Sequence, residues 1–146
     1  MPPFTFRLQQ VLEYRSQLED QAKMAFAAAK DAHDRRQKEV ERLAAALDAA
    51  WNERHEAVLT NRNEAWLLEN YCKGLAEDLE SARASLKHLA IVMEEARQKL
   101  VLAMQDRKLL DKLKEKQQVR HAKEENLREQ RFNDEICTLR PRAAPF

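Results

Sequence analysis

The sequence predicts an all-α fold, a long two-helix antiparallel coiled coil (a helical hairpin) with an overhanging C-terminal helix. Of its 146 residues, 84 are Ala, Leu, Glu, Lys or Arg, which is the composition of long helices and coiled coils. The four prolines lie at positions 2, 3, 141 and 145, and Gly74 is the single glycine. Nothing between Phe4 and Arg140 therefore removes a backbone donor. The scarcity of turn-forming residues excludes a sheet.

The first helix is expected at about residues 5–58, because apolar residues recur there at alternating steps of three and four. Two steps of four in succession, through Ala32, Arg36 and Val40, predict a local unwinding of the supercoil. The expected seam is Leu8, Val11, Arg15, Leu18, Ala22, Ala25, Ala29, Ala32, Arg36, Val40, Leu43, Leu47, Ala50 and Arg54.

A bend is expected at about residues 59–65, the one internal place where Thr and Asn cluster. Thr60, Asn61 and Asn63 are candidate caps or turn residues. A turn here would fold the chain back on itself as a single coiled-coil hairpin over residues 1–146.

The second helix is expected at about residues 66–137, followed by a disordered tail at 138–146. Its apolar stripe fades after Leu113, so its last part should project beyond the first helix. Two successive steps of four, through Tyr71, Leu75 and Leu79, span Gly74 and predict a second insertion in the heptad repeat. The expected seam is Leu68, Tyr71, Leu75, Leu79, Ala82, Leu86, Leu89, Met93, Ala96, Leu100, Ala103, Arg107 and Leu110.

Charge and composition exclude several classes of protein. The 26 basic and 25 acidic residues nearly cancel, so bulk attraction to nucleic acid is not expected. No stretch approaches the roughly 20 apolar residues of a membrane span. The N-terminus shows no secretory signal. Cys72 and Cys137 are far apart in sequence, which indicates structural or idle thiols in a reducing cytoplasm.

Residues that could support catalysis or bind a cofactor are sparse. A phosphate-binding loop needs more than one glycine. His121 with Glu125, and His55 beside Glu56, are weak candidates for metal ligands, and a solvated helix surface explains them better. Carboxylate pairs lie on open helix surface, where no cavity raises a pKa. We expect no enzyme activity, no cofactor and no metal.

Two groups of residues are candidates for protein binding. The span 107–123 holds seven basic residues against two acidic ones, which suits either a solvated face or a docking face. Phe132 and Ile136 would form a small apolar face farther along the same helix. The basic residues are Arg107, Lys108, Lys112, Lys114, Lys116, Arg120 and Lys123.

Aromatic residues form the second group, near the bend. Tyr71 lies on the expected seam, which indicates core packing. Trp66 lies off the seam, where a large amphipathic ring suits an interface anchor. Trp51 falls at the same end of the hairpin.

Both ends of the chain resemble the FliJ family of flagellar type III export proteins. Residues 4–12, Phe-Thr-Phe-Arg-Leu-Gln-Gln-Val-Leu, followed by Arg15 and Glu19, are similar to that family's opening. Residues 107–115, Arg-Lys-Leu-Leu-Asp-Lys-Leu-Lys-Glu, resemble its R-K-x-L-E-K-L-K-E segment, with Asp111 where Glu is usual. Trp66 with Tyr71, and Asp134 with Glu135, complete the resemblance.

The resemblance implies a two-helix stalk similar to the central stalk of rotary ATP synthases. It implies docking into a hexameric export ATPase, contact with the export-gate membrane protein, and escort of export substrates or their chaperones. By this analogy the basic segment with Phe132 and Ile136 would meet the ATPase, whereas Trp51, Trp66 and Tyr71 would face the gate. The expected location is the cytoplasmic face of the cell membrane.

A generic structural coiled coil that self-associates is the competing hypothesis. A monomeric hairpin should have a mass near 17.1 kDa, and a self-paired dimer twice that. In a parallel self-dimer, equivalent seam positions of the two copies would face each other. Like charges would then repel at Arg15, Arg36 and Arg54 of the first seam, which favours the monomeric hairpin. A nucleic-acid binder is a third and weaker possibility, because no aromatic residues are interleaved with the basic ones.

Overall fold

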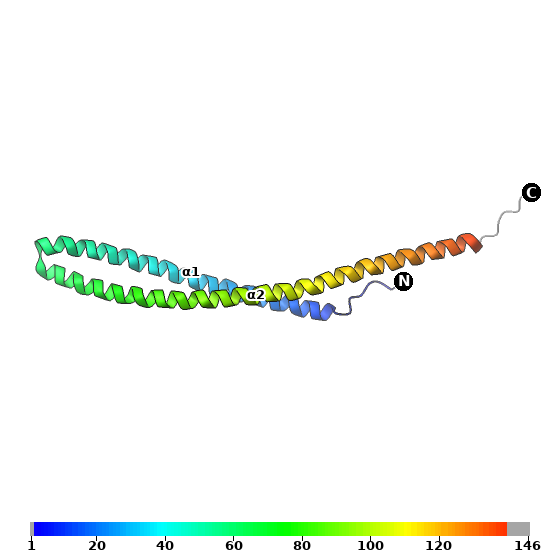
Figure 1. Ribbon diagram of the computed structural model, residues 1–146, viewed down its shortest axis with the longest axis horizontal. Helices are drawn as coiled ribbons and strands as arrows, with labels where there is room; N and C mark the ends of the chain where they lie inside the picture. The colour runs from blue at the N-terminus through cyan, green and yellow to red at the C-terminus, as the bar shows by residue number, and fades with distance from the viewer. Residues whose placement is uncertain (1, 140–146) are drawn as a thin grey trace, which may run out of the picture. The chain divides into compact units, whose positions relative to one another are not determined.

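The computed structural model describes residues 2–139, and these form two helices joined by a tight turn (Figure 1). Helix α1 is Gln9–Thr60 and helix α2 is Arg62–Leu139. No strand occurs within residues 2–139. The predicted all-α helical hairpin is confirmed.

Contacts divide the chain into two compact units. The bend unit is Asp20–Leu102. The terminal unit combines the segment up to Glu19 with the segment from Ala103 onward. In each unit a part of α1 packs antiparallel against a part of α2, so each has its own stretch of helix–helix contact.

The core of the bend unit is built from both helices. Cys72 is completely buried, and Trp51 packs against the cluster from its edge. Its buried members are Leu43, Ala50, Cys72, Leu75, Leu79 and Ala82. Small residues facing larger ones let the two helices approach closely and interdigitate.

A single residue, Asn61, separates the helices. Its side-chain Oδ1 accepts hydrogen bonds from the backbone N–H groups of Asn63 at 3.1 Å and Glu64 at 3.5 Å. This is the N-cap geometry, which satisfies donors that the first turn of a helix leaves free. Glu64 also places a negative charge in the first turn, where the helix dipole favours it. The bend is therefore shorter than the expected 59–65.

Helix α1 begins at Gln9 rather than near residue 5. The Gln9 N–H donates to the Phe6 carbonyl at 3.1 Å, which forms a turn ahead of the helix. Phe6 is buried and Phe4 is half-buried, so this segment packs on the terminal unit instead of continuing the helix. At the other end, α2 includes Thr138 and Leu139, whereas the rest of the expected tail, 140–146, lies outside the described residues.

The seam of α2 is a heptad repeat without interruption. The expectation that Tyr71 lies on it was wrong: Tyr71 is exposed and Cys72 is buried in its place. With Cys72, steps of three and four alternate throughout, and the insertion expected at Gly74 disappears. The seam is Ala65, Leu68, Cys72, Leu75, Leu79, Ala82, Leu86, Leu89, Met93, Ala96, Leu100, Ala103, Arg107, Leu110 and Lys114, each buried or half-buried.

The seam of α1 is equally regular, and its first half differs from the expected one. Leu8, Val11 and Ala25 are exposed, and the insertion expected around Arg36 is absent. Polar Glu19 and His33 occupy positions that an apolar pattern does not select. The seam is Leu12, Arg15, Glu19, Ala22, Phe26, Ala29, His33, Arg36, Val40, Leu43, Leu47, Ala50, Arg54 and Ala57, each buried or half-buried.

Gly74 lies on the exposed surface of α2 in ordinary helical conformation. Its φ is not positive, and a Cβ added to it would meet no atom within 4 Å. Glycine in a helix interior costs about 1 kcal/mol relative to alanine. No contact within the described residues offsets that cost.

Removing a seam leucine should destabilise the hairpin. Leu79 is 5% exposed, so Leu79→Ala leaves a cavity that should cost about 2–4 kcal/mol of unfolding free energy. Leu59 is 87% exposed, and Leu59→Ala should change that free energy by less than about 0.5 kcal/mol. Denaturant unfolding followed by helical circular dichroism measures both. Equal effects of the two substitutions would contradict the seam.

Candidate protein-binding surfaces

A network of buried charge ties the two helices together in the terminal unit. Glu19 is 3% exposed and accepts a hydrogen bond from Nε of Arg107. The same guanidinium donates from Nη1 to Oδ2 of Asp111, one turn farther along α2. The hydrogen bond to Glu19, supported by the one to Asp111, raises the pKa of Arg107 against the opposing effect of burial. The carboxylates of Glu19 and Asp111 therefore favour the charged form of the Arg107 guanidinium.

Two further polar contacts extend this connection along the terminal unit. Arg15 lies 3.4 Å from Asp106 in an ion pair between α1 and α2. Nζ of Lys114 donates to the Gln9 side chain at 2.8 Å. The segments that resemble the FliJ family's opening and its R-K-x-L-E-K-L-K-E segment thus contact each other. Some of the charged residues in these two segments therefore hold α1 and α2 together.

The predicted basic segment consequently divides into internal and outward-facing residues. Arg107 and Lys114 are half-buried on the seam and bonded to α1. Arg120 is exposed and pairs with Glu124 at 3.5 Å. The remaining four, Lys108, Lys112, Lys116 and Lys123, are exposed on α2.

The N-terminal segment covers part of α2 beyond the start of α1. The Phe4 and His121 rings have centroids 5.6 Å apart and tilt by 58°. Nε2 of His121 lies 3.8 Å from Oε1 of Glu125, one turn farther along α2. Sequence reasoning missed this contact. Pro2 and Pro3, which disfavour a helix reaching back through the N-terminal segment, were the available signal.

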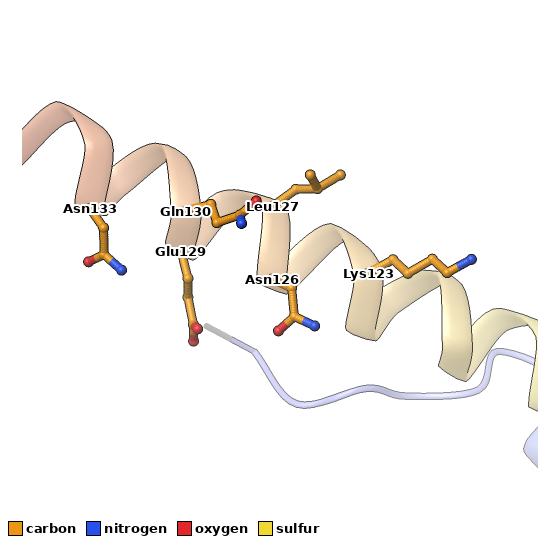
Figure 2. Close-up of a pocket in the computed structure, with 6 residues that line it drawn as sticks. All are labelled: Lys123, Asn126, Leu127, Glu129, Gln130 and Asn133. Atoms are coloured by element: carbon orange, nitrogen blue, oxygen red, sulfur yellow. The ribbon is translucent and has the colours of Figure 1, made fainter.

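Farther along α2 the surface is open. The described residues that line a shallow groove there all belong to α2, and Figure 2 shows their side chains spread along successive turns rather than converging on one point. They are Lys123, Asn126, Leu127, Glu129, Gln130 and Asn133. Phe132 and Ile136 are exposed on the same part of the helix. This geometry suits contact with another protein better than enclosure of a small molecule.

The three aromatic residues of the bend unit lie in different environments. Trp51 is half-buried, and the guanidinium carbon of Arg54 lies 5.1 Å from its ring centroid. Arg54 also pairs with Glu69 of α2 at 3.8 Å. Trp66 is 63% exposed and Tyr71 is 56% exposed. Trp66 and Tyr71 are accordingly available to a partner, whereas Trp51 contributes to the packing of the hairpin.

Neither a metal cluster nor a membrane span appears in the part of the chain that the structure describes. Within residues 2–139, no three His, Cys, Asp or Glu side chains come together as ligands. Neither described helix holds an apolar stretch that could cross a bilayer. Cys72 is buried and Cys137 is exposed, and both are free thiols.

The fold defines a coiled-coil hairpin protein with its exposed charged and aromatic side chains on open helix surface. A family model described as flagellar FliJ protein matches residues 4–145. The chain belongs to the FliJ family, and its role is in flagellar protein export. No curated protein and no solved structure matches it significantly.

The buried charge network should be energetically coupled. Arg107→Gln removes from buried Glu19 the guanidinium of the opposite helix, and Glu19→Gln leaves Arg107 with Asp111 alone. Each substitution should lower the unfolding free energy by more than the loss of an exposed pair does. The double variant should cost less than the sum of the two single variants, because each single variant already breaks the bond between Glu19 and Arg107. Thermal and denaturant unfolding of the four proteins gives the cycle.

The matched control is the exposed pair of Asp31 and Arg35, at 3.1 Å on the surface of α1. Its coupling should stay near a few tenths of a kcal/mol, as for other exposed helix pairs. A coupling between Glu19 and Arg107 no larger than this would show that burial adds nothing to the network.

Proposed function

We propose that the protein is a non-enzymatic stalk, adaptor and general chaperone of the flagellar type III export apparatus. It docks into the hexameric export ATPase, promotes assembly or activity of that ATPase, and links it to the export-gate membrane protein. The observation that carries this proposal is the family match over residues 4–145. The fold supports it, because a two-helix coiled coil can reach partners from two separate units.

The ATPase meets the terminal unit. The four outward lysines of α2 supply positive charge there, and Phe132 and Ile136 supply an apolar contact. Such charges favour rapid, salt-dependent association with an acidic surface. Arg107 and Lys114 act indirectly, because they hold α2 in register with α1.

The export gate meets the bend unit. Trp66 and Tyr71 are exposed aromatic residues, a type that is enriched where interfaces carry most of their binding energy. Trp51 supports this surface from within the hairpin. The protein then acts in the cytoplasm, at the inner face of the membrane, as a monomer that also escorts export substrates or their chaperones.

Hydrolysis of ATP by the cognate export ATPase, measured over a range of ATPase concentration, tests the stalk role. If the protein promotes ring assembly, stimulation is largest where the ATPase is dilute, since assembly then limits the rate. An unchanged rate at every concentration would reject the stalk role and leave an adaptor or substrate escort.

Reversing the outward charges should remove this stimulation. The variant with Lys108, Lys112, Lys116 and Lys123 all changed to Glu keeps the internal bonds of Arg107 and Lys114. It should lose most of the stimulation, about tenfold or more, with little loss of helix content. The same ATPase assay, with circular dichroism beside it, measures the effect.

A matched control reverses four exposed basic residues of the bend unit, Lys30, Lys38, Arg42 and Lys87. It makes the same change in net charge and should retain stimulation. Equal loss in both variants would attribute the effect to net charge rather than to the proposed ATPase surface.

Removing the exposed indole should weaken binding to the gate. Trp66→Ala should reduce affinity for the purified cytoplasmic part of the gate protein by about tenfold or more, as for an interface anchor. It should change unfolding free energy little, because Trp66 is largely exposed. Trp51→Ala should instead lower the unfolding free energy, because packing is lost, and should change affinity for the gate protein less. Calorimetry of binding and unfolding separates the two, and unchanged affinity for Trp66→Ala would remove that residue from the gate surface.

A further inference from the structure

The heptad phase sorts the outward side chains of the terminal unit onto two flanks. Leu12 in α1 and Arg107 in α2 occupy position a, the first seam position of the heptad abcdefg. On each helix, positions g and c then lie on one side of the seam, and positions e and b lie on the other. The side chains of each flank can therefore be read from their heptad positions.

Contacts between the helices show that the g sides of α1 and α2 adjoin each other. Arg15, at seam position d of α1, forms its ion pair with Asp106, a g residue of α2. Lys114, at seam position a of α2, donates to Gln9, an e residue of α1. Because position d borders g and position a borders e, the two helices present a shared g–c flank. Its members are Val11, Tyr14, Leu18, Asp106, Leu109, Leu113, Lys116, Arg120 and Lys123.

Apolar side chains from both helices gather on the g–c flank. Tyr14 of α1 is 57% exposed and Leu109 of α2 is 70% exposed. Val11 and Leu113 are also exposed, and Leu18 is half-buried. Exposed apolar side chains that adjoin in this way mark an interaction surface.

Basic side chains border the apolar ones on the same flank. Lys116, Arg120 and Lys123 are exposed and follow Leu113 along α2. The acidic member of the flank, Asp106, is held by its ion pair with α1. Between residues 11 and 123, the g–c flank is therefore apolar and positively charged.

Acidic side chains lie on the opposite e–b flank. Glu13 of α1 and Glu115 of α2 are exposed there, and Asp111 is half-buried. Lys108 is the basic residue of that flank between residues 9 and 123. The two flanks thus differ in the sign of their charge as well as in their apolar content.

We propose that the g–c flank of the terminal unit lies on an anionic lipid bilayer. Its apolar side chains enter the boundary between headgroups and acyl chains, and its basic side chains meet the lipid phosphates. Neither described helix crosses the bilayer in this contact. The inference goes beyond the proposed function, in which the protein reaches the membrane through the gate protein.

Three features favour a lipid surface over an acidic protein as the occupant. The apolar side chains stand on two parallel ridges, Tyr14 on α1 and Leu109 on α2, and a flat layer meets both at once. The bordering charges are Lys and Arg, whose long side chains reach from an apolar boundary to the headgroups. The acidic flank faces away, which is the orientation that a negatively charged surface imposes.

Co-sedimentation of the purified full chain with lipid vesicles tests the proposal. One set of vesicles contains phosphatidylglycerol with phosphatidylcholine, and the other contains phosphatidylcholine alone. The chain should bind the anionic vesicles about tenfold or more tightly than the neutral ones, because several basic side chains act together. Raising the salt concentration should weaken the binding, since these charges are then screened.

Apolar variants identify the flank. Tyr14→Ser combined with Leu109→Ser should lower affinity for the anionic vesicles about tenfold or more, because two exposed apolar side chains are lost. The matched control, Val58→Ser combined with Leu59→Ser, removes two exposed apolar side chains of the bend unit and should bind as the unaltered chain does. Circular dichroism should show the same helix content in all three proteins.

Charge variants test the basic border. Lys116→Glu combined with Arg120→Glu should lower affinity for the anionic vesicles about tenfold or more. Lys30→Glu combined with Lys38→Glu makes the same change in net charge on exposed residues of the bend unit and should lower affinity less. Equal losses in the two variants would show that net charge, and not the g–c flank, determines binding, and would overturn the proposal.

Each contrary result has its own reading. If the unaltered chain binds neither vesicle, or binds both equally, the lipid contact is overturned. If the variant of Tyr14 and Leu109 binds anionic vesicles as tightly as the unaltered chain, the g–c flank is overturned as the lipid-binding surface. If that variant instead loses ATPase stimulation while the unaltered chain ignores vesicles, the flank meets an acidic protein and the lipid surface is rejected. The vesicle assay contains neither ATPase nor gate protein, so failure of the proposed function would not alter its result.

Discussion

The uninterrupted heptad seam is the constraint on which the other features of this protein depend. Once Leu12 begins the series in α1 and Ala65 begins it in α2, spacing decides which side chains are buried and which face outward. Helix propensity favours a helical conformation in both segments. Most of the stability of the two helices, however, comes from packing of the stripe of α1 against the stripe of α2. Each helix then has a single buried face, and the remaining faces are available to partners.

The two units meet this constraint with different chemistry. The bend unit buries a cluster of aliphatic side chains and Cys72, so hydrophobic burial stabilises it. The terminal unit places Glu19 and Arg107 on the seam and buries few large apolar side chains beyond Phe6 and Leu12. A polar seam position costs stability and selects a register, because a shift of one helix would separate buried Glu19 from Arg107. In the terminal unit, the register between the two helices is thus selected by charge.

Sequence periodicity was sufficient for the fold class and for most of the second seam. It failed at Tyr71, because the pattern assigned this aromatic residue to the seam in place of the neighbouring Cys72. Cys is nonetheless among the most frequently buried residues. It failed in the first half of α1 for a related reason. Glu19 and His33 are polar, so the search for apolar residues assigned the neighbouring Leu18 and Ala32 to the seam instead. That assignment required an insertion in the heptad repeat, which the helix does not contain. The Glu19 and Arg107 pairing could not be read from either helix alone, since it depends on the register between them.

The same spacing explains why one run of basic residues has two roles. Arg107 and Lys114 are seven residues apart and share a seam position, so both turn toward α1 and find acceptors there. Lys116 and Lys123 are also seven residues apart, but on a different heptad position, and they face outward. Charge content alone does not distinguish these pairs, whereas the phase of the heptad does. In the proposed contact with the ATPase, the outward lysines are therefore the charges available to the partner, whereas the inward arginine and lysine hold α2 in register with α1.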